Sequence, residues 1–141
     1  MDIRTLTPAY AVSPQIAPEE LALIAEAGFR TVICNRPDAE VPPDFQADAI
    51  REAALAAGLK FVLNPVVHTA ITPELIALQA NTVEGPDQPV LAYCASGNRS
   101  TIVWALGQAA TTPADELIAT AAQAGYQLEG LRPQLDALYR G

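Results

Sequence analysis

Short apolar runs alternate with longer segments of helical character along this chain. The runs have the length of buried strands and are rich in β-branched residues, whereas the longer segments place apolar residues on one face. We expect strands within residues 3–12 (two short pieces), 29–34, 59–63 and 90–93. We expect helices in residues 18–27, 45–57, 73–83, 99–110, 113–124 and 131–139. This alternation predicts an α/β fold with a mostly parallel sheet of about four to five strands and helices on both faces.

Some of the predicted helices have recognisable ends. Pro18 and the two glutamates after it open the first helix, and Gly28 closes it. Thr72, in front of Pro73, is a suitable N-cap for the third helix. No repeat, low-complexity segment or change of composition divides the chain, so we expect residues 1–141 to form a single domain.

The strongest chemical signal lies between Val90 and Ala110. An apolar run ends at Tyr93 and is followed by Cys94-Ala95-Ser96-Gly97-Asn98-Arg99-Ser100, then by an apolar segment of helical length. A loop that turns into a helix N-terminus directs several backbone N–H groups at one point, and the helix dipole adds partial positive charge there. A cysteine that faces this point is expected to be largely thiolate, the nucleophilic form.

The other side chains of the loop suit an anion site. Arg99 supplies a planar fork of donors for an oxyanion, and Gly97 permits a positive φ or a close approach of the backbone to a ligand. Ser100 could donate to the thiolate or assist its departure. We therefore interpret Cys94 as a nucleophile surrounded by substrate-binding donors from residues 95–99. The alternative is a structural cysteine in front of a capped helix, which is the commoner role of a core cysteine.

This loop is similar to those of two enzyme groups. Protein tyrosine phosphatases have a cysteine, five residues, an arginine and then serine or threonine, whereas four residues separate Cys94 from Arg99 here. The Cys-x-x-Gly-Asn-Arg-Ser pattern and its spacing look more like the loop of single-domain rhodaneses.

Over nearly its whole length the chain resembles the phosphatase-like domain of the bacterial beta-lactamase-hydrolase-like proteins. That family is also catalogued as one of sulfur transferases. The resemblance rests on residues 11–15, 28–40, 64–66, 71–73 and 91–104. It implies a protein tyrosine phosphatase-like fold.

Composition argues against several classes of function. The chain has 8 basic and 16 acidic residues, a net charge of −8, so a general nucleic-acid-binding surface is not expected. No apolar run reaches transmembrane length, and the N-terminus lacks a basic flank and an apolar signal core, which favours a cytoplasmic protein without a membrane partner. One histidine and two cysteines, without a Cys-x-x-Cys pair, make a structural zinc site hard to build.

The loop from Asn35 to Glu40 follows the predicted strand 29–34. Ligands of open parallel sheets bind beyond the carboxyl ends of the strands. Asp38 and Glu40 are therefore candidates to face the site, with Arg36 as a second cation for the substrate. A solvated turn rich in charge is an equally good interpretation of each.

The resemblance to phosphatases also implies a general acid upstream of the cysteine, which protonates the leaving alcohol. The loop of residues 64–70 occupies that place and contains no aspartate or glutamate. His68 is the only group there that titrates in a suitable range, although a lone loop histidine is more often a surface residue. Asp38 is the rival candidate. Because this loop has no carboxylic acid to act as general acid, we expect weak activity that favours aryl phosphates.

We therefore expect a cysteine-dependent phosphatase-like hydrolase with Cys94 as nucleophile. The supporting catalytic candidates are Arg99, Ser100, His68 and Asp38. One alternative is a rhodanese-like sulfurtransferase that forms a Cys94 persulfide, since the short loop narrows the phosphate cradle and sulfur transfer needs no general acid. A second is a non-catalytic anion-binding regulatory module. None requires a metal or organic cofactor. The expected partner is a phosphorylated or sulfane-sulfur small molecule or peptide, and the oligomeric state stays open.

Two further residues have competing interpretations. Cys34 ends a strand that could neighbour the Cys94 strand, so a disulfide formed under peroxide could shield the nucleophile. A small buried hydrophobe is the commoner role for Cys34. Trp104, four residues beyond Ser100, is expected to lie in the core rather than to contact substrate.

Overall fold

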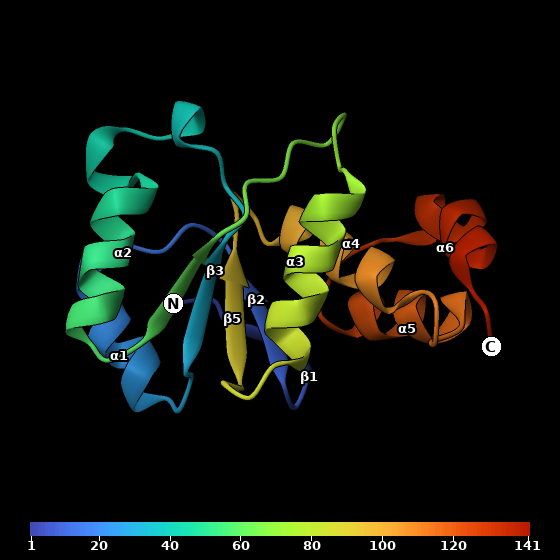
Figure 1. Cartoon of the computed structure of the whole chain (residues 1–141), viewed down its shortest axis with the longest axis horizontal. Helices are drawn as coiled ribbons and strands as arrows, with labels where there is room; N and C mark the ends of the chain where they lie inside the picture. The colour runs from blue at the N-terminus through green and yellow to red at the C-terminus, as the bar shows by residue number, and fades with distance from the viewer.

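A five-stranded sheet forms the centre of the fold, and the computed structural model describes residues 1–141. The strand order is β1-β2-β5-β3-β4. The strands are β1 (Arg4–Thr7), β2 (Tyr10–Ser13), β3 (Thr31–Cys34), β4 (Lys60–Leu63) and β5 (Val90–Tyr93). The β1–β2 hairpin is antiparallel, and β2, β5, β3 and β4 run parallel (Figure 1). The prediction of a mostly parallel sheet is confirmed.

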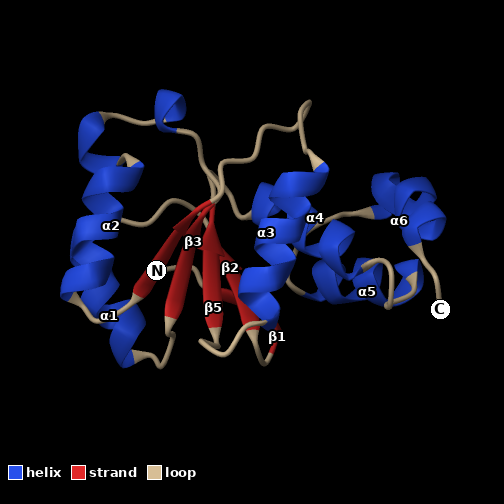
Figure 2. Cartoon of the chain, viewed as in Figure 1, coloured by secondary structure: helices blue, strands red, loops and turns tan.

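Helices cover both faces of this sheet, as predicted. They are α1 (Leu21–Glu26), α2 (Ala47–Ala56), α3 (Pro73–Glu84), α4 (Asn98–Gln108), α5 (Ala114–Gln123) and α6 (Arg132–Leu138). In Figure 2, α1 and α2 lie on one side of the sheet and α3, α4, α5 and α6 lie on the other. A bilayer-spanning segment is absent, since no helix here combines the required length with the required apolar character.

The central strand β5 contributes to two separate cores. Val90 and Ala92 pack in a cluster that also contains Trp104 of α4. Leu91 and Tyr93 pack in a second cluster, with residues of α1 and α2. Successive strand residues point to opposite faces, and all of β5 is buried. The strand is therefore held from both sides, which fixes the position of the residue that follows it, Cys94.

The helix boundaries follow local signals. The Thr72 hydroxyl accepts the Leu75 N–H at the start of α3, as predicted for an N-cap. The second helix begins at Ala47 rather than Phe45, because Pro43–Phe45 forms a separate 3-10 turn and Gln46 is extended. Helix α4 begins at Asn98, which places the arginine and serine of the loop in its first turn, as predicted.

Candidate active site

Three loops meet at the edge where β3, β4 and β5 end. The N–H of Asn35, directly after β3, donates to the Tyr93 carbonyl at 2.8 Å. The N–H of Val66, in the loop after β4, donates to the Asn35 carbonyl at 2.8 Å. Carboxyl ends of parallel strands share one edge, which is where α/β folds place ligand sites. Cys94, the first residue after β5, lies at this edge.

The loop after Cys94 folds back toward its sulfur. The Gly97 N–H donates to the Cys94 Sγ at 3.1 Å. Gly97 has a φ of 95°, in the left-handed region that favours glycine. A Cβ at this position would lie 2.2 Å from the Tyr126 hydroxyl oxygen. Both the backbone conformation and the close neighbour therefore require glycine here.

Several amides of this loop have no protein acceptor. The N–H groups of Ala95, Ser96, Arg99 and Ser100 make no hydrogen bond within the protein. Two of them belong to the first turn of α4, where a helix leaves its N–H groups without intrahelical partners. The positive end of the helix dipole lies at the same place. The loop therefore presents free donors of the kind that bind anions.

Arg99 is buried and fully oriented. It is 7% exposed, and its two terminal nitrogens donate to the two carboxylate oxygens of Glu40, each at 2.7 Å. One of them also donates to the Val66 carbonyl at 2.9 Å. The ion pair lowers the pKa of Glu40 and raises the pKa of Arg99. Arg36 donates to the same carboxylate at 3.2 Å, so Glu40 joins two cations.

A buried polar network supports the helix start from below. The Ser100 hydroxyl donates to the Asn35 side-chain oxygen at 2.9 Å. Gln79 of α3, with no exposed surface, accepts from the side chains of Asn35 and Asn64 and donates to Asn35 and Tyr10. The Tyr10 hydroxyl in turn donates to the Ser100 carbonyl at 2.7 Å. These hydrogen bonds join β2, α3 and the residues that follow β3 and β4 to the first turn of α4.

Access to the sulfur is closed in this structure. Cys94 is 0% exposed, whereas Ala95 and Ser96 above it are exposed. The structure contains five cavities, and other residues line all of them. The donors of an anion site are thus in place around a sulfur that has no exposed surface. No group of three or more His, Cys, Asp or Glu residues gathers to hold a metal ion.

Comparison with known proteins identifies the family. Residues 2–111 match the family model for the phosphatase-like domain of beta-lactamase hydrolase-like proteins. The chain belongs to this family. A beta-lactamase hydrolase-like protein from Xylella fastidiosa is 33% identical over 108 residues, which make up 77% of this chain and 25% of that protein. The chain thus spans about a quarter of the length of this curated relative.

Solved structures agree with the phosphatase-like domain assignment. A crystal structure of a candidate phosphatase from Neisseria meningitidis is 34% identical, covers 98% of this chain and 99% of that one, and superposes with a TM-score of 0.85. The core catalytic domain of a PP-IP phosphatase from S. cerevisiae is 14% identical, with coverage of 99% and 85% and a TM-score of 0.70. At that identity the likeness shows the fold alone. The predicted protein tyrosine phosphatase-like fold is confirmed.

The remaining candidates of this phosphatase-like domain lie in different surroundings. Asp38 accepts the Ala47 N–H at 2.7 Å, so its carboxylate caps α2. His68 is exposed and lines an apolar cavity together with residues of α3, α4 and α6. Arg36 bonds Glu40 and the Gln15 side chain. Of the three, Arg36 alone is linked to Arg99, through Glu40.

Cys34 is the last residue of β3, at the same edge of the sheet as the site. It pairs with Tyr93 in the β3–β5 register, and the two share the core under α1 and α2. Its thiol donates to the Arg36 carbonyl at 3.3 Å, and burial raises its pKa. Both cysteines are free thiols.

The sequence did not predict that Tyr126 or Gln79 would contribute to the site. Tyr126 follows α5, and its hydroxyl donates to the Ser96 carbonyl at 2.9 Å. Nothing in its local sequence marks it as part of a site. Gln79 did carry a signal, because it is a polar residue with apolar neighbours in a helix, and buried polar residues need partners.

Proposed function

We propose that this phosphatase-like domain is a cysteine-dependent phosphatase that hydrolyses phosphate monoesters. The observation that carries the proposal is the convergence of free donors on one sulfur. The Gly97 N–H donates to the Cys94 Sγ, the unpaired amides and the positive end of α4 belong to the same loop and helix start, and Arg99 interacts with Cys94. In this proposal Cys94 is the nucleophile and the loop and Arg99 bind the anion.

The hydrogen bonds of Arg99 leave a defined pair of donors for the substrate. A guanidinium has five N–H groups. Two bonds to Glu40 and one to Val66 use three of them. The Nε–H and one Nη2–H remain, and these two lie on one edge of the planar group. That edge suits two oxygens of a phosphoryl group, and Glu40, bound at the adjacent edge of the guanidinium, orients Arg99.

The reaction requires two displacements at phosphorus. The thiolate of Cys94 forms an S–P bond while the ester P–O bond breaks, and the leaving oxygen takes the electron pair of that bond. Water then attacks the phosphocysteine, the S–P bond breaks, and inorganic phosphate and the thiolate are released. Loop amides and Arg99 stabilise the charge on the transferred oxygens in both steps.

The leaving group determines which substrates react well. The Asp38 carboxylate is bonded to Ala47, and His68 is exposed in the loop after β4. Neither forms a hydrogen bond with the Cys94 loop. An aryl oxide departs with little help from a general acid, whereas an alkoxide needs a proton. We therefore assign aryl phosphates, such as phosphotyrosine, as the preferred substrate class.

Turnover also requires local opening, since Cys94 has no exposed surface. Exposed Ala95 and Ser96 lie in the loop that covers it. Movement of this loop would admit the phosphoryl group and let it take the free amides. Binding of inorganic phosphate should therefore slow amide exchange at residues 95–100.

The test compares p-nitrophenyl phosphate with matched phosphotyrosine and phosphoserine peptides. We expect hydrolysis of both aryl esters, slower release from phosphoserine, and no turnover by Cys94→Ser, with Cys34→Ser as the matched control. Equal rates on the two peptides would contradict the aryl preference. A persulfide on Cys94 after thiosulfate, seen as a gain of about 32 Da, with no phosphate release, would identify a sulfurtransferase instead. Phosphate binding without either reaction would identify an anion-binding module.

A further inference from the structure

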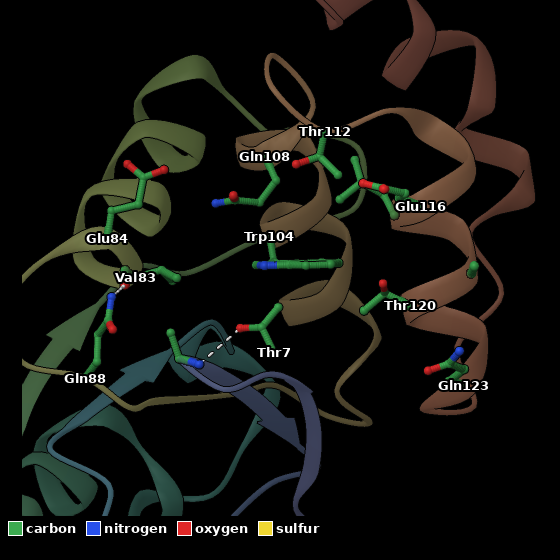
Figure 3. A pocket seen from close by; sticks show the side chains of 13 residues that line it. Thr7, Val83, Glu84, Gln88, Trp104, Gln108, Thr112, Glu116, Thr120 and Gln123 are labelled. Atoms are coloured by element: carbon green, nitrogen blue, oxygen red, sulfur yellow. Dashed lines mark hydrogen bonds between the residues drawn. The ribbon is translucent and has the colours of Figure 1, made fainter. Parts of the chain in front are cut away.

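One of the five cavities lies at the other end of α4 from the Cys94 loop (Figure 3). Its volume is about 520 Å³, and its walls come from the β1–β2 turn, the last turns of α3 and α4, and α5. Arg99 is the second residue of α4, while Gln108, in the cavity wall, is the last. A helix of 11 residues, about 16 Å long, thus separates the two places. The cavity is not part of the proposed active site.

The electrostatics of this cavity favour a cation. The charged residues in its wall are Glu84 and Glu116, and no lysine, arginine or histidine lines it. Glu84 is the last residue of α3, and neither α3 nor α4 has a basic residue in its last turn. Helix C-termini carry partial negative charge. The first turn of α5, which contains Glu116, brings one positive helix end to the wall, so two negative helix ends and two carboxylates still leave the cavity with an excess of negative charge.

A buried donor points into the same space. Trp104 is 5% exposed and stacks on Tyr10, with ring centroids 6.1 Å apart and planes within 10°. Its indole N–H has no hydrogen-bond partner in the protein. The Tyr93 hydroxyl is the one fully buried side-chain polar atom without a partner, so the indole nitrogen is not fully buried. Because Trp104 lines the cavity, its N–H reaches that space. Figure 3 shows the indole edge-on across the cavity, with its nitrogen on the side of Val83 and Glu84.

The rest of the wall suits hydroxyl groups. It contains three threonine hydroxyls and three glutamine amides, each able to donate and to accept (Thr7, Thr112, Thr120, Gln88, Gln108, Gln123). We propose that this cavity binds an aminated polyol, a small organic cation with several hydroxyl groups. Its ammonium group pairs with Glu84, on the side of the Trp104 indole nitrogen, and one of its hydroxyl oxygens accepts from that indole N–H, while Glu116 adds negative charge at the far wall.

The chain has a single tryptophan, so fluorescence reports on this cavity alone. The experiment titrates the whole chain at pH 7 with N-methylglucamine, with its neutral counterpart sorbitol, and with putrescine, a cation without hydroxyls. We expect N-methylglucamine to give a saturable change, with an affinity about tenfold higher than either of the others. The variant Glu84→Gln/Glu116→Gln should lose about tenfold in affinity for it, and hydrolysis of p-nitrophenyl phosphate by this variant should match that of wild type.

Each other outcome overturns the proposal. No saturable change means that the cavity is no site for such ligands. Equal binding of sorbitol, or equal binding by the double variant, means that the carboxylates do not select a cation. Equal binding of putrescine means that the hydroxyl-rich wall does not contribute. The circular dichroism spectrum of the double variant distinguishes loss of binding from loss of fold.

Discussion

The Tyr126 hydroxyl donates a 2.9 Å hydrogen bond to the Ser96 carbonyl, across 30 residues of sequence. The same peptide unit carries the Gly97 N–H, which donates to the Cys94 Sγ at 3.1 Å. Because a trans peptide is planar, its C=O and N–H point in opposite directions. Tyr126 therefore holds the carbonyl outward while the N–H faces the sulfur. We infer that Tyr126 positions the donor nearest to the proposed nucleophile.

Replacing Tyr126 with phenylalanine should weaken catalysis without unfolding the protein. The change removes one hydrogen bond, so we expect kcat for p-nitrophenyl phosphate to fall by about tenfold. The loss should appear in kcat rather than in KM, because the Gly97 N–H contacts the Cys94 sulfur. Tyr139→Phe, at an exposed tyrosine, is the matched control. An unchanged kcat would leave Tyr126 with a packing role only.

Neutralising Glu40 should weaken substrate binding. Glu40→Gln removes the charge that pairs with the Arg99 guanidinium and orients it. We therefore expect kcat/KM to fall by about tenfold, mainly through KM. Steady-state kinetics on p-nitrophenyl phosphate measures this, with Glu19→Gln at an exposed site as the control. A rise in kcat/KM would show instead that the Glu40 carboxylate competes with the substrate for Arg99.

The same ion pair should make stability depend on pH. Its hydrogen bonds to Arg99 lower the pKa of Glu40 in the folded state. A depressed folded pKa stabilises the protein above the unfolded value, about 4.3 for glutamate, and this contribution disappears as pH falls through the folded pKa. Urea unfolding should show wild type more stable than Glu40→Gln at neutral pH, and the difference should vanish in acid. A difference that persists in acid would argue against the ion pair as its source.

Removing the buried Gln79 amide should destabilise the fold. Gln79→Leu deprives Asn35, Asn64 and Tyr10 of hydrogen-bond partners in a region without solvent. Asn64 and Tyr10 each keep one other partner and Asn35 keeps two, so we expect a loss of about 2 kcal/mol in the free energy of unfolding. Urea denaturation measures it, and Gln134→Leu, at an exposed helical position, is the control. Stability equal to that of wild type would mean that leucine packing offsets the lost network.

The order of strands and helices could be predicted from local patterns. Apolar runs such as Val90–Tyr93 are short, β-branched or aliphatic, and separated by helical segments, and each became a strand of the sheet. The Thr72 cap was recognisable because capping needs only neighbouring residues. The 3-10 turn at Pro43–Phe45 was not separated from α2, since its end depends on the backbone angles of a single residue, Gln46.

By itself, the sequence determined the loop that joins Cys94 to Arg99 and the helix after it, because chain geometry over a few residues is set locally. The tertiary structure decided which groups complete the site. Glu40 reaches Arg99 across 59 residues, Tyr126 reaches Ser96 across 30, and Asp38 is used as a helix cap instead. Such partners depend on which loops come together at the edge of the sheet and on which face each strand residue occupies. Periodicity predicts that a residue is buried, but only packing selects the atom it meets.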